Sequence, residues 1–141
     1  MIQYIAEDIK MPAIAKQKLN RWIKNIATSY NKTTGDIAFI FCSDDKILDI
    51  NNLYLQHDYY TDIITFDYTI GNKISGDIFI SIETVQSNAI EYGTEFADEL
   101  HRILIHGILH LCGQDDKTPE LREEMTHKEN SALEMLKAGD E

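Results

Sequence analysis

One short run of the chain decides the fold: IAFIFC, at residues 37–42. The run consists of β-branched, aromatic and other apolar residues and contains no charge, which favours a strand. Because polar residues do not alternate with apolar ones, this strand is expected to be buried on both faces, as in a sheet that helices cover. The run therefore predicts a central strand with other strands beside it.

Weaker strand patterns and five helical patterns surround this run. Strands are predicted over residues 1–6, 61–67 and 75–82, and the last two are joined by a hairpin-sized connection. Helices are predicted from Pro12 to about Tyr30, from Ser43 or Asp44 to about Tyr54, from Glu83 to Tyr92, from Thr94 to Gly113, and from Thr118 to about Lys137. This order is neither a strict alternation nor an all-β meander. We therefore expect an α+β fold, with one mixed four-stranded sheet packed with about five helices.

Length and composition fit one globular domain over residues 1–141. Of the 141 residues, 43% are hydrophobic and 26% are charged, which excludes disordered, collagen-like and low-complexity chains. The chain shows neither a signal-peptide pattern nor an apolar run of ~20 residues, so we expect a cytoplasmic protein without a membrane partner. The two cysteines, Cys42 and Cys112, lie in apolar runs and are expected to be reduced, buried thiols.

The charge of the chain is strongly negative but uneven. The formal net charge is −11, which argues against a protein that holds nucleic acid by charge alone. Residues 1–34, however, carry six basic and two acidic side chains, and Lys16, Arg21 and Lys24 can share one helical face. A solvated helix surface is the simpler interpretation of this face, and docking of a polyanion is the alternative.

Two histidines within residues 104–116 carry the chemistry. His106 and His110 are four residues apart, so on a helix both imidazoles can point at a common ion. Gly113 is placed to end that helix, and the residues after it can swing Asp116 back over the histidines. Two imidazoles and one carboxylate leave a fourth position open, which is typical of a catalytic zinc. We predict one Zn²⁺ per chain, held by His106, His110 and Asp116 at the helix end, with Asp115 as the rival third ligand.

Other interpretations of the histidines stay open. His106 and His110 could be ordinary, partly buried residues; His101 and His127 lack such neighbours and are expected at the surface, and His57 is ambiguous. The spacing is also similar to that of the metzincin proteases. Their general base is a glutamate after the first histidine, where this chain has Gly107. Glycine costs a helix about 1 kcal/mol, which suggests that another backbone or a substrate approaches closely here.

A longer set of motifs resembles one known family. Residues 106–116, HGILHLCGQDD, are similar to the signature HGxLHLxGYDH of the YbeY family. Residues 60–66, YTDIITF, and residues 76–81, GDIFIS, are similar to two strands of that family. Met125, Glu129 and Leu133 fall where its last helix repeats such residues. The similarity covers roughly residues 36–137 in the right order.

The resemblance implies an activity, a cofactor and partners. Members of the family are bacterial metal-dependent endoribonucleases associated with ribosomal RNA maturation, including the 3′ end of the small-subunit RNA, and with ribosome quality control. The implied reaction is attack of a metal-activated water on a phosphodiester of single-stranded or ribosomal RNA, with the ribosome or ribosomal proteins as partners. This chain departs twice: Asp116 stands where the family has a third histidine, and Leu55 stands where it has an arginine. A carboxylate ligand broadens metal choice from Zn²⁺ toward Mn²⁺ or Fe²⁺.

Two other functions compete with this one. A zinc metallopeptidase is the first, although Gly107 leaves it without the usual base. The second is a non-catalytic ribosome-assembly factor whose metal is structural, because the family arginine is missing. The candidate residues for stacking on nucleic-acid bases are Tyr54, Tyr59 and Tyr60. The candidates for accepting hydrogen bonds from the metal ligands are Asp62 and Asp77. The sequence identifies no residue as the catalytic base.

Overall fold

The computed structural model describes residues 1–55 and 61–139 and, of Leu55, only the backbone. In this part of the chain the elements are β1 (Ile2–Ala6), α1 (Lys16–Ser29), β2 (Thr33–Cys42), α2 (Asp44–Leu55), β3 (Ile63–Asp67), β4 (Lys73–Ser81), α3 (Ile82–Tyr92), α4 (Phe96–Leu111) and α5 (Pro119–Ala138). The predicted α+β class is confirmed. His57, Tyr59 and Tyr60 lie outside the described residues.

The sheet has the order β1-β2-β4-β3 and is mixed, as predicted. Strands β1 and β4 run parallel to β2, and β3 runs antiparallel to β4 along the edge of the sheet. Phe39 and Phe41 of β2 are fully buried, which confirms the central strand. Edge strand β3 leads directly into the functional site described below.

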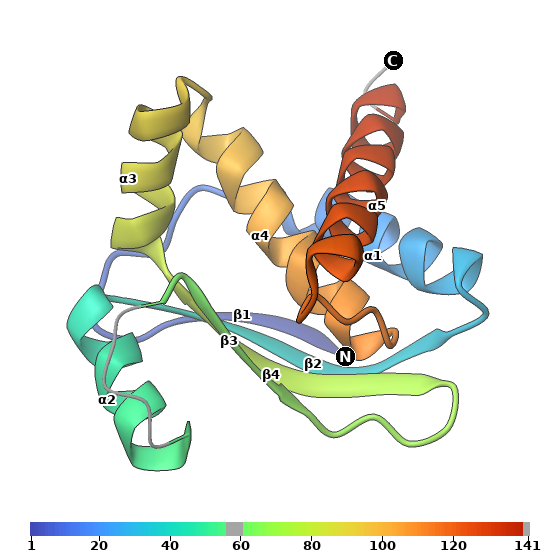
Figure 1. Cartoon of the computed structure of the whole chain (residues 1–141), viewed down its shortest axis with the longest axis horizontal. Coiled ribbons are helices and arrows are strands. Elements are labelled where there is room, and N and C mark those ends of the chain that lie inside the picture. The colour runs from blue at the N-terminus through green and yellow to red at the C-terminus, as the bar shows by residue number, and fades with distance from the viewer. Residues whose placement is uncertain (56–60, 140–141) are drawn as a thin grey trace.

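The two faces of the sheet are covered unequally. Helices α1, α4 and α5 lie over one face, and α2 lies against the other (Figure 1). The main core fills the first face and includes Trp22, Phe39, Ile78 and Leu104. On the second face, a smaller cluster of buried residues consists of Cys42, Ile47, Ile50 and Ile64.

Gly107 lets α4 approach the sheet closely. A Cβ at this position would lie 3.0 Å from Cδ1 and Cγ2 of Ile78 and 3.3 Å from Cδ1 of Ile63. The expectation that a backbone or a substrate approaches here is therefore wrong, because the neighbours are side chains of β4 and β3. The glycine sets the distance between α4 and the strands that face it.

Two helices begin later than the sequence indicates. α1 begins at Lys16 rather than Pro12, because Met11 and Ile14 turn toward the main core before the helix starts. α4 begins at Phe96, because the amide of Thr94 is used to end α3, where it donates to the carbonyl of Ala89 at 2.9 Å. The predicted left-handed end of α3 at Gly93 is confirmed by its φ of 67°.

Two further expectations concern the cysteines and membranes. Both thiols are free and Cys42 is buried, as expected, whereas Cys112 is half-buried, which corrects its expected burial. Among the helices in the described part of the chain, none has the length and apolar character needed to cross a membrane.

Candidate metal centre

His106 and His110 lie on successive turns of α4. The helix buries an apolar stripe that includes Leu100, Leu104 and Ile108 against the main core, and the two histidines lie beside this stripe, half-buried. Their ring centroids are 4.7 Å apart and their planes are inclined by 76°. Packing of α4 on the sheet thus fixes both imidazoles on the side that faces β3.

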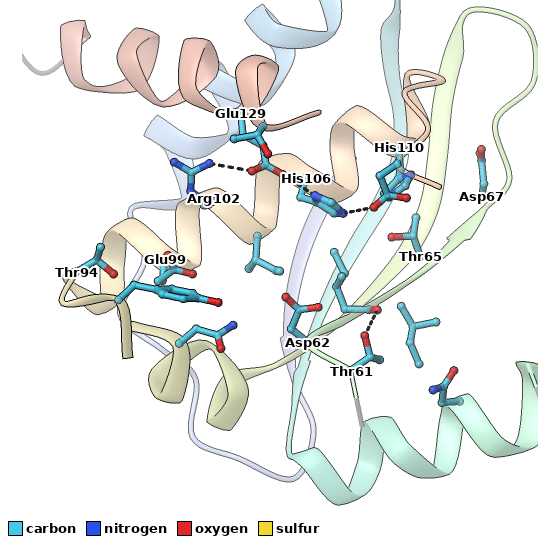
Figure 2. A pocket seen from close by; sticks show the side chains of 18 residues that line it. Thr61, Asp62, Thr65, Asp67, Thr94, Glu99, Arg102, His106, His110 and Glu129 are labelled. Carbon is cyan, nitrogen blue, oxygen red and sulfur yellow. Dashed lines mark hydrogen bonds and ion pairs between the residues drawn. The ribbon is translucent and has the colours of Figure 1, made fainter. Parts of the chain in front are cut away.

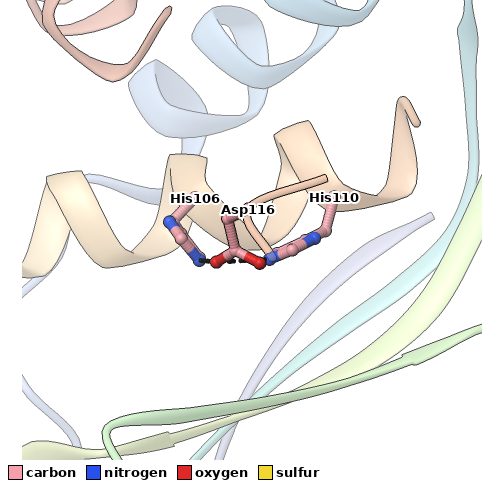
Figure 3. A group of neighbouring side chains, drawn as sticks. All are labelled: His106, His110 and Asp116. Atoms are coloured by element: carbon pink, nitrogen blue, oxygen red, sulfur yellow. Dashed lines mark ion pairs between the residues drawn. The ribbon is translucent and has the colours of Figure 1, made fainter. Parts of the chain in front are cut away.

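Asp116 returns to the histidines after a tight turn. α4 ends at Leu111, and Gly113 adopts a φ of 102°, the left-handed region that favours glycine. Oδ2 of Asp116 lies 3.4 Å from Nε2 of His106 and 3.4 Å from Nε2 of His110 (Figure 3). One nitrogen of each histidine and one carboxylate oxygen of Asp116 all lie within 4.8 Å of one another.

Asp115, the rival ligand, has a different role. Its Oδ1 accepts from the backbone amide of Asp116 at 2.7 Å and from that of Lys117 at 3.1 Å. These bonds close the turn that carries Asp116. The structure therefore brings Asp116, and not Asp115, to the two histidines.

Lys128 of α5 ties down the same turn. Its Nζ donates to Oε1 of Gln114 at 2.5 Å and lies 5.1 Å from the ring centroid of Tyr30. Nε2 of Gln114 in turn donates to the carbonyl of Asp115 at 2.8 Å. The residues directly before Asp116 are thus anchored to α5.

Glu129 of α5 orients His106. Its Oε2 lies 2.6 Å from Nδ1 of His106, and its Oε1 accepts from Nη1 of Arg102 at 2.8 Å (Figure 2). A carboxylate that accepts a hydrogen bond from Nδ1 keeps the proton of the neutral imidazole on that nitrogen. Nε2, which faces Asp116, is then unprotonated and can bind a cation. The second nitrogen of the guanidinium, Nη2, donates to Oδ1 of Asn130 at 2.7 Å.

The roles of Glu129 and Arg102 are not among the predictions made from the sequence. A signal for Glu129 was present, because it shares a helical stripe with the buried Met125, Ala132 and Leu136. A carboxylate in an apolar stripe must have a partner, since an unpaired buried charge is costly. Arg102 and His106, one turn apart on α4, are the partners that it has.

The charges around His106 determine its pKa. Burial alone would lower the pKa, but the hydrogen bond and negative charge of Glu129, together with the charges of Asp116 and Asp62, raise it above its ordinary value. Asp62 itself has a raised pKa because it is buried, although His106 opposes this shift. Since only the unprotonated nitrogen binds a metal, cation binding at this site competes with protonation of His106.

A pocket of about 1040 Å³ lies in front of the three side chains. The close view shows Asp62, Thr61 and Thr65 facing the two histidines from the strand side (Figure 2). Of the two aspartates considered in the sequence analysis, Asp62 lines this pocket, whereas Asp77 does not.

The stacking candidates are also placed differently. Tyr54 is exposed and packs edge to face with Phe66 at 5.9 Å between centroids, and it is not among the described residues that line the pocket. Tyr92, at the end of α3, lines the pocket instead. His101 is half-buried against Trp22, which corrects its expected surface position, and His127 is exposed as predicted.

The donor set of this cluster fits a divalent cation. Two imidazole nitrogens and one carboxylate oxygen are ligands of zinc, manganese and iron. The nitrogen that each histidine directs at the cluster is Nε2, and the other nitrogen of His106 is occupied by Glu129. His106, His110 and Asp116 could therefore hold a metal ion.

Comparison with known proteins decides the family. The model of the family described as endoribonuclease YbeY matches residues 2–137. The chain belongs to this family. It is 62% identical over 135 residues to the endoribonuclease YbeY of Parabacteroides distasonis, covering 96% of this chain and 95% of the relative. It is 44% identical over 136 residues to that of Porphyromonas gingivalis, covering 96% and 90%.

A solved structure has a similar fold. The solution structure of TM1509 from Thermotoga maritima matches with a TM-score of 0.65 and 27% identity, covering 96% of this chain and 89% of that one. The family model and the curated relatives confirm the family resemblance read from residues 106–116 and from the two strand motifs. Within the family, Asp116 stands where the signature above has a histidine, and the structure brings it to the same two histidines.

Proposed function

We propose that this chain is a metal-dependent endoribonuclease that hydrolyses single-stranded RNA, with one divalent ion held by His106, His110 and Asp116. Membership of the endoribonuclease family supports the activity class. The observation that carries the metal assignment is the position of Oδ2 of Asp116, 3.4 Å from Nε2 of both histidines.

Each side chain of the site has a different role. His106 and His110 present Nε2 to the cation, Asp116 supplies a negative charge, and Glu129 keeps the proton of His106 on Nδ1. When bound, a divalent ion supplies Lewis acidity toward a phosphodiester oxygen and lowers the pKa of a water. Zinc is the proposed ion, and the carboxylate also suits Mn²⁺ or Fe²⁺.

An open site favours catalysis over a structural metal. Structural zinc sites have four protein ligands, whereas catalytic sites have three and leave a position for water or substrate. The cluster found among the described residues offers three ligands and opens on the pocket. These features favour an enzyme over an assembly factor whose metal only stabilises the fold.

The position after the first histidine argues against a peptidase. In metzincins a glutamate there acts as the general base. Gly107 is buried against Ile78 and Ile63, so it neither supplies a carboxylate nor faces the pocket. The peptidase alternative therefore rests on the spacing of the two histidines alone.

We further propose that the substrate is ribosomal RNA, in maturation of the small-subunit 3′ end and in quality control of ribosomes in the cytoplasm. A chain of net charge −11 is poorly suited to hold free RNA by charge. Helix α1 is the exception, because Lys16, Arg21 and Lys24 are exposed and the helix contains no acidic residue. A ribosomal particle can combine such a basic contact with protein contacts.

The test is cleavage of a single-stranded RNA and of its duplex by the metal-loaded enzyme, with and without chelator. We expect the single strand to be cut, the duplex to be spared and the chelator to abolish activity. Asp116→Ala should lose metal and cleavage, whereas Asp115→Ala should keep measurable metal binding, since Asp115 holds the turn and is not itself a ligand.

Other outcomes would overturn parts of this proposal. Cleavage of peptides and not of RNA would establish the peptidase. Full metal binding without any hydrolysis would favour the assembly factor. Loss of metal in Asp115→Ala and its retention in Asp116→Ala would reverse the assignment of the third ligand.

A further inference from the structure

The pocket is acidic for an enzyme that acts on a polyanion. In the described part of the chain, five carboxylates line it: Asp62, Asp67, Glu99, Asp116 and Glu129. Among the described lining residues, Arg102 is the one lysine or arginine. A bound divalent ion would compensate part of this charge near the histidines, but a strand of RNA also brings phosphates on either side of the bond that is cut.

Arg102 lies one turn of α4 before His106 and lines the same pocket. It precedes His106 by four residues, so its side chain leaves the same face of α4 about 6 Å along the helix axis. Nη1 of Arg102 and Nδ1 of His106 bind the two oxygens of the same Glu129 carboxylate. The guanidinium is therefore held in the pocket wall beside the candidate metal centre (Figure 2).

The guanidinium keeps donors for a second partner. Arginine has five N–H donors in a planar fork, and the structure gives it two hydrogen bonds, to Glu129 at 2.8 Å and to Asn130 at 2.7 Å. Its side chain is 34% exposed. Glu129 accepts hydrogen bonds from both His106 and Arg102, and Glu99 is a second carboxylate whose charge interacts with that of Arg102. A fixed, partly exposed guanidinium is well suited to bind phosphate.

We propose that Arg102 binds the RNA phosphate next to the one that is hydrolysed, and so places the strand across the metal centre. This inference rests on the proposed function and names the residue that would recognise the substrate backbone. Glu129 and Asn130 hold the guanidinium in place, and the phosphate accepts hydrogen bonds from the N–H groups that these two residues do not use.

The test compares two substrates, one with a flanking phosphate and one without. A single-stranded oligonucleotide has phosphates beside the cleaved bond, whereas a dinucleotide with one phosphodiester has none. In Arg102→Gln, we expect kcat/KM on the oligonucleotide to fall about 10- to 100-fold, the range for loss of a charge-assisted contact. We expect kcat/KM on the dinucleotide to fall by a clearly smaller factor, because only the indirect effect of Arg102 through Glu129 acts on that substrate. Arg122→Gln, on the exposed side of α5, removes the same charge and is the matched control.

Two further measurements separate this role from a structural one. Zinc content and affinity of Arg102→Gln should stay close to the wild type. The logarithm of oligonucleotide affinity should depend less steeply on the logarithm of salt concentration, with a slope reduced by about 0.7, the value for one phosphate contact on a single strand. Arg102→Lys should restore part of the affinity, because it keeps the charge without the fork.

Several results would overturn the proposal. An equal loss on both substrates, or loss of zinc, would mean that Arg102 acts only through Glu129 on His106. No loss on either substrate would mean that no phosphate touches it. If the wild type cuts no RNA, the proposed function fails. The binding measurement then still decides on Arg102, because an unchanged affinity and salt slope in Arg102→Gln would exclude the contact.

Discussion

The two faces of the sheet carry hydrophobic cores of different size; we call the face with the larger core, under α1, α4 and α5, the deep side. Under α1, α4 and α5, buried residues from both termini of the chain form one continuous core. Under α2, the buried cluster consists of Cys42, Ile47, Ile50 and Ile64. The three candidate metal ligands belong to the deep side, on α4 and the turn that follows it, whereas the α2 side contributes the buried Asn51 and Ile64 to the pocket wall but none of these ligands. Side chains that must hold a fixed geometry are thus built on the better-supported face.

The strongest test of this comparison removes a ligand from the deep side. His110→Ala should lose bound zinc and reduce RNA cleavage to background, because two ligands hold the ion poorly. The fold should survive, since the core under α4 does not include the histidine ring. Metal analysis, a cleavage assay and circular dichroism measure the three quantities. His127→Ala, at an exposed position of α5, is the control. Global unfolding of His110→Ala would show that the metal is structural.

A pair of matched substitutions tests the depth of the two cores. Ile105 in α4 and Ile47 in α2 are both fully buried and both helical, so replacement by alanine changes helix propensity equally. Truncating a buried isoleucine costs about 2–5 kcal/mol, and the cost depends on how well the site collapses. We expect the loss in free energy of unfolding to lie near the upper end of this range for Ile105→Ala and near the lower end for Ile47→Ala. Urea unfolding measures both losses. Equal losses would contradict the comparison.

Glu129 allows a smaller perturbation within the deep side. Glu129→Gln keeps the size of the side chain but replaces one carboxylate oxygen with an NH₂ group, which is a donor. One of the two hydrogen bonds, from His106 or from Arg102, therefore loses its acceptor. We expect zinc affinity to fall about 10- to 100-fold, as for other residues that orient a metal ligand. Competition with a chromophoric chelator measures this change. Unaltered affinity would mean that Glu129 does not orient His106.

The two thiols provide the mildest comparison. Burial raises the pKa of Cys42, in the α2 cluster, from 9.0 to about 12. Burial also raises the pKa of Cys112, at the end of α4, from 9.0 to about 11, although Lys32 and Lys128 oppose the shift. Both thiols should resist alkylation near pH 8 in the folded protein, Cys42 the more strongly. Rapid modification of Cys42 without denaturant would show that the α2 face opens readily.

The same pKa shifts predict how stability changes with pH. Above about pH 9 the unfolded chain releases these protons and the folded chain keeps them, so the thiol contribution to the free energy of unfolding is complete below pH 9 and falls as the pH rises. Urea midpoints of the wild type and Cys42→Ala across this range measure the effect. A wild type that loses no more stability than the variant would contradict it.

Sequence patterns predicted the elements that depend on local chemistry. The apolar run at residues 37–42, the glycine at position 113 and the spacing of His106 and His110 each act within one element or turn, and the structure contains what they indicate. The start of α1 and the role of Glu129 depend on which distant residues are packed against them. No spacing within one segment specifies such contacts, although the apolar stripe around Glu129 indicates its burial.

The proximity of the three candidate ligands in the sequence has a consequence for folding. His106, His110 and Asp116 all lie within residues 106–116, whereas the parallel strands β1, β2 and β4 pair across long separations. Local contacts form sooner than distant ones during folding. A zinc ion can therefore engage this segment before the sheet is complete, and it also binds the unfolded chain to some extent. Added zinc should then raise the melting temperature by less than its affinity for the native protein implies.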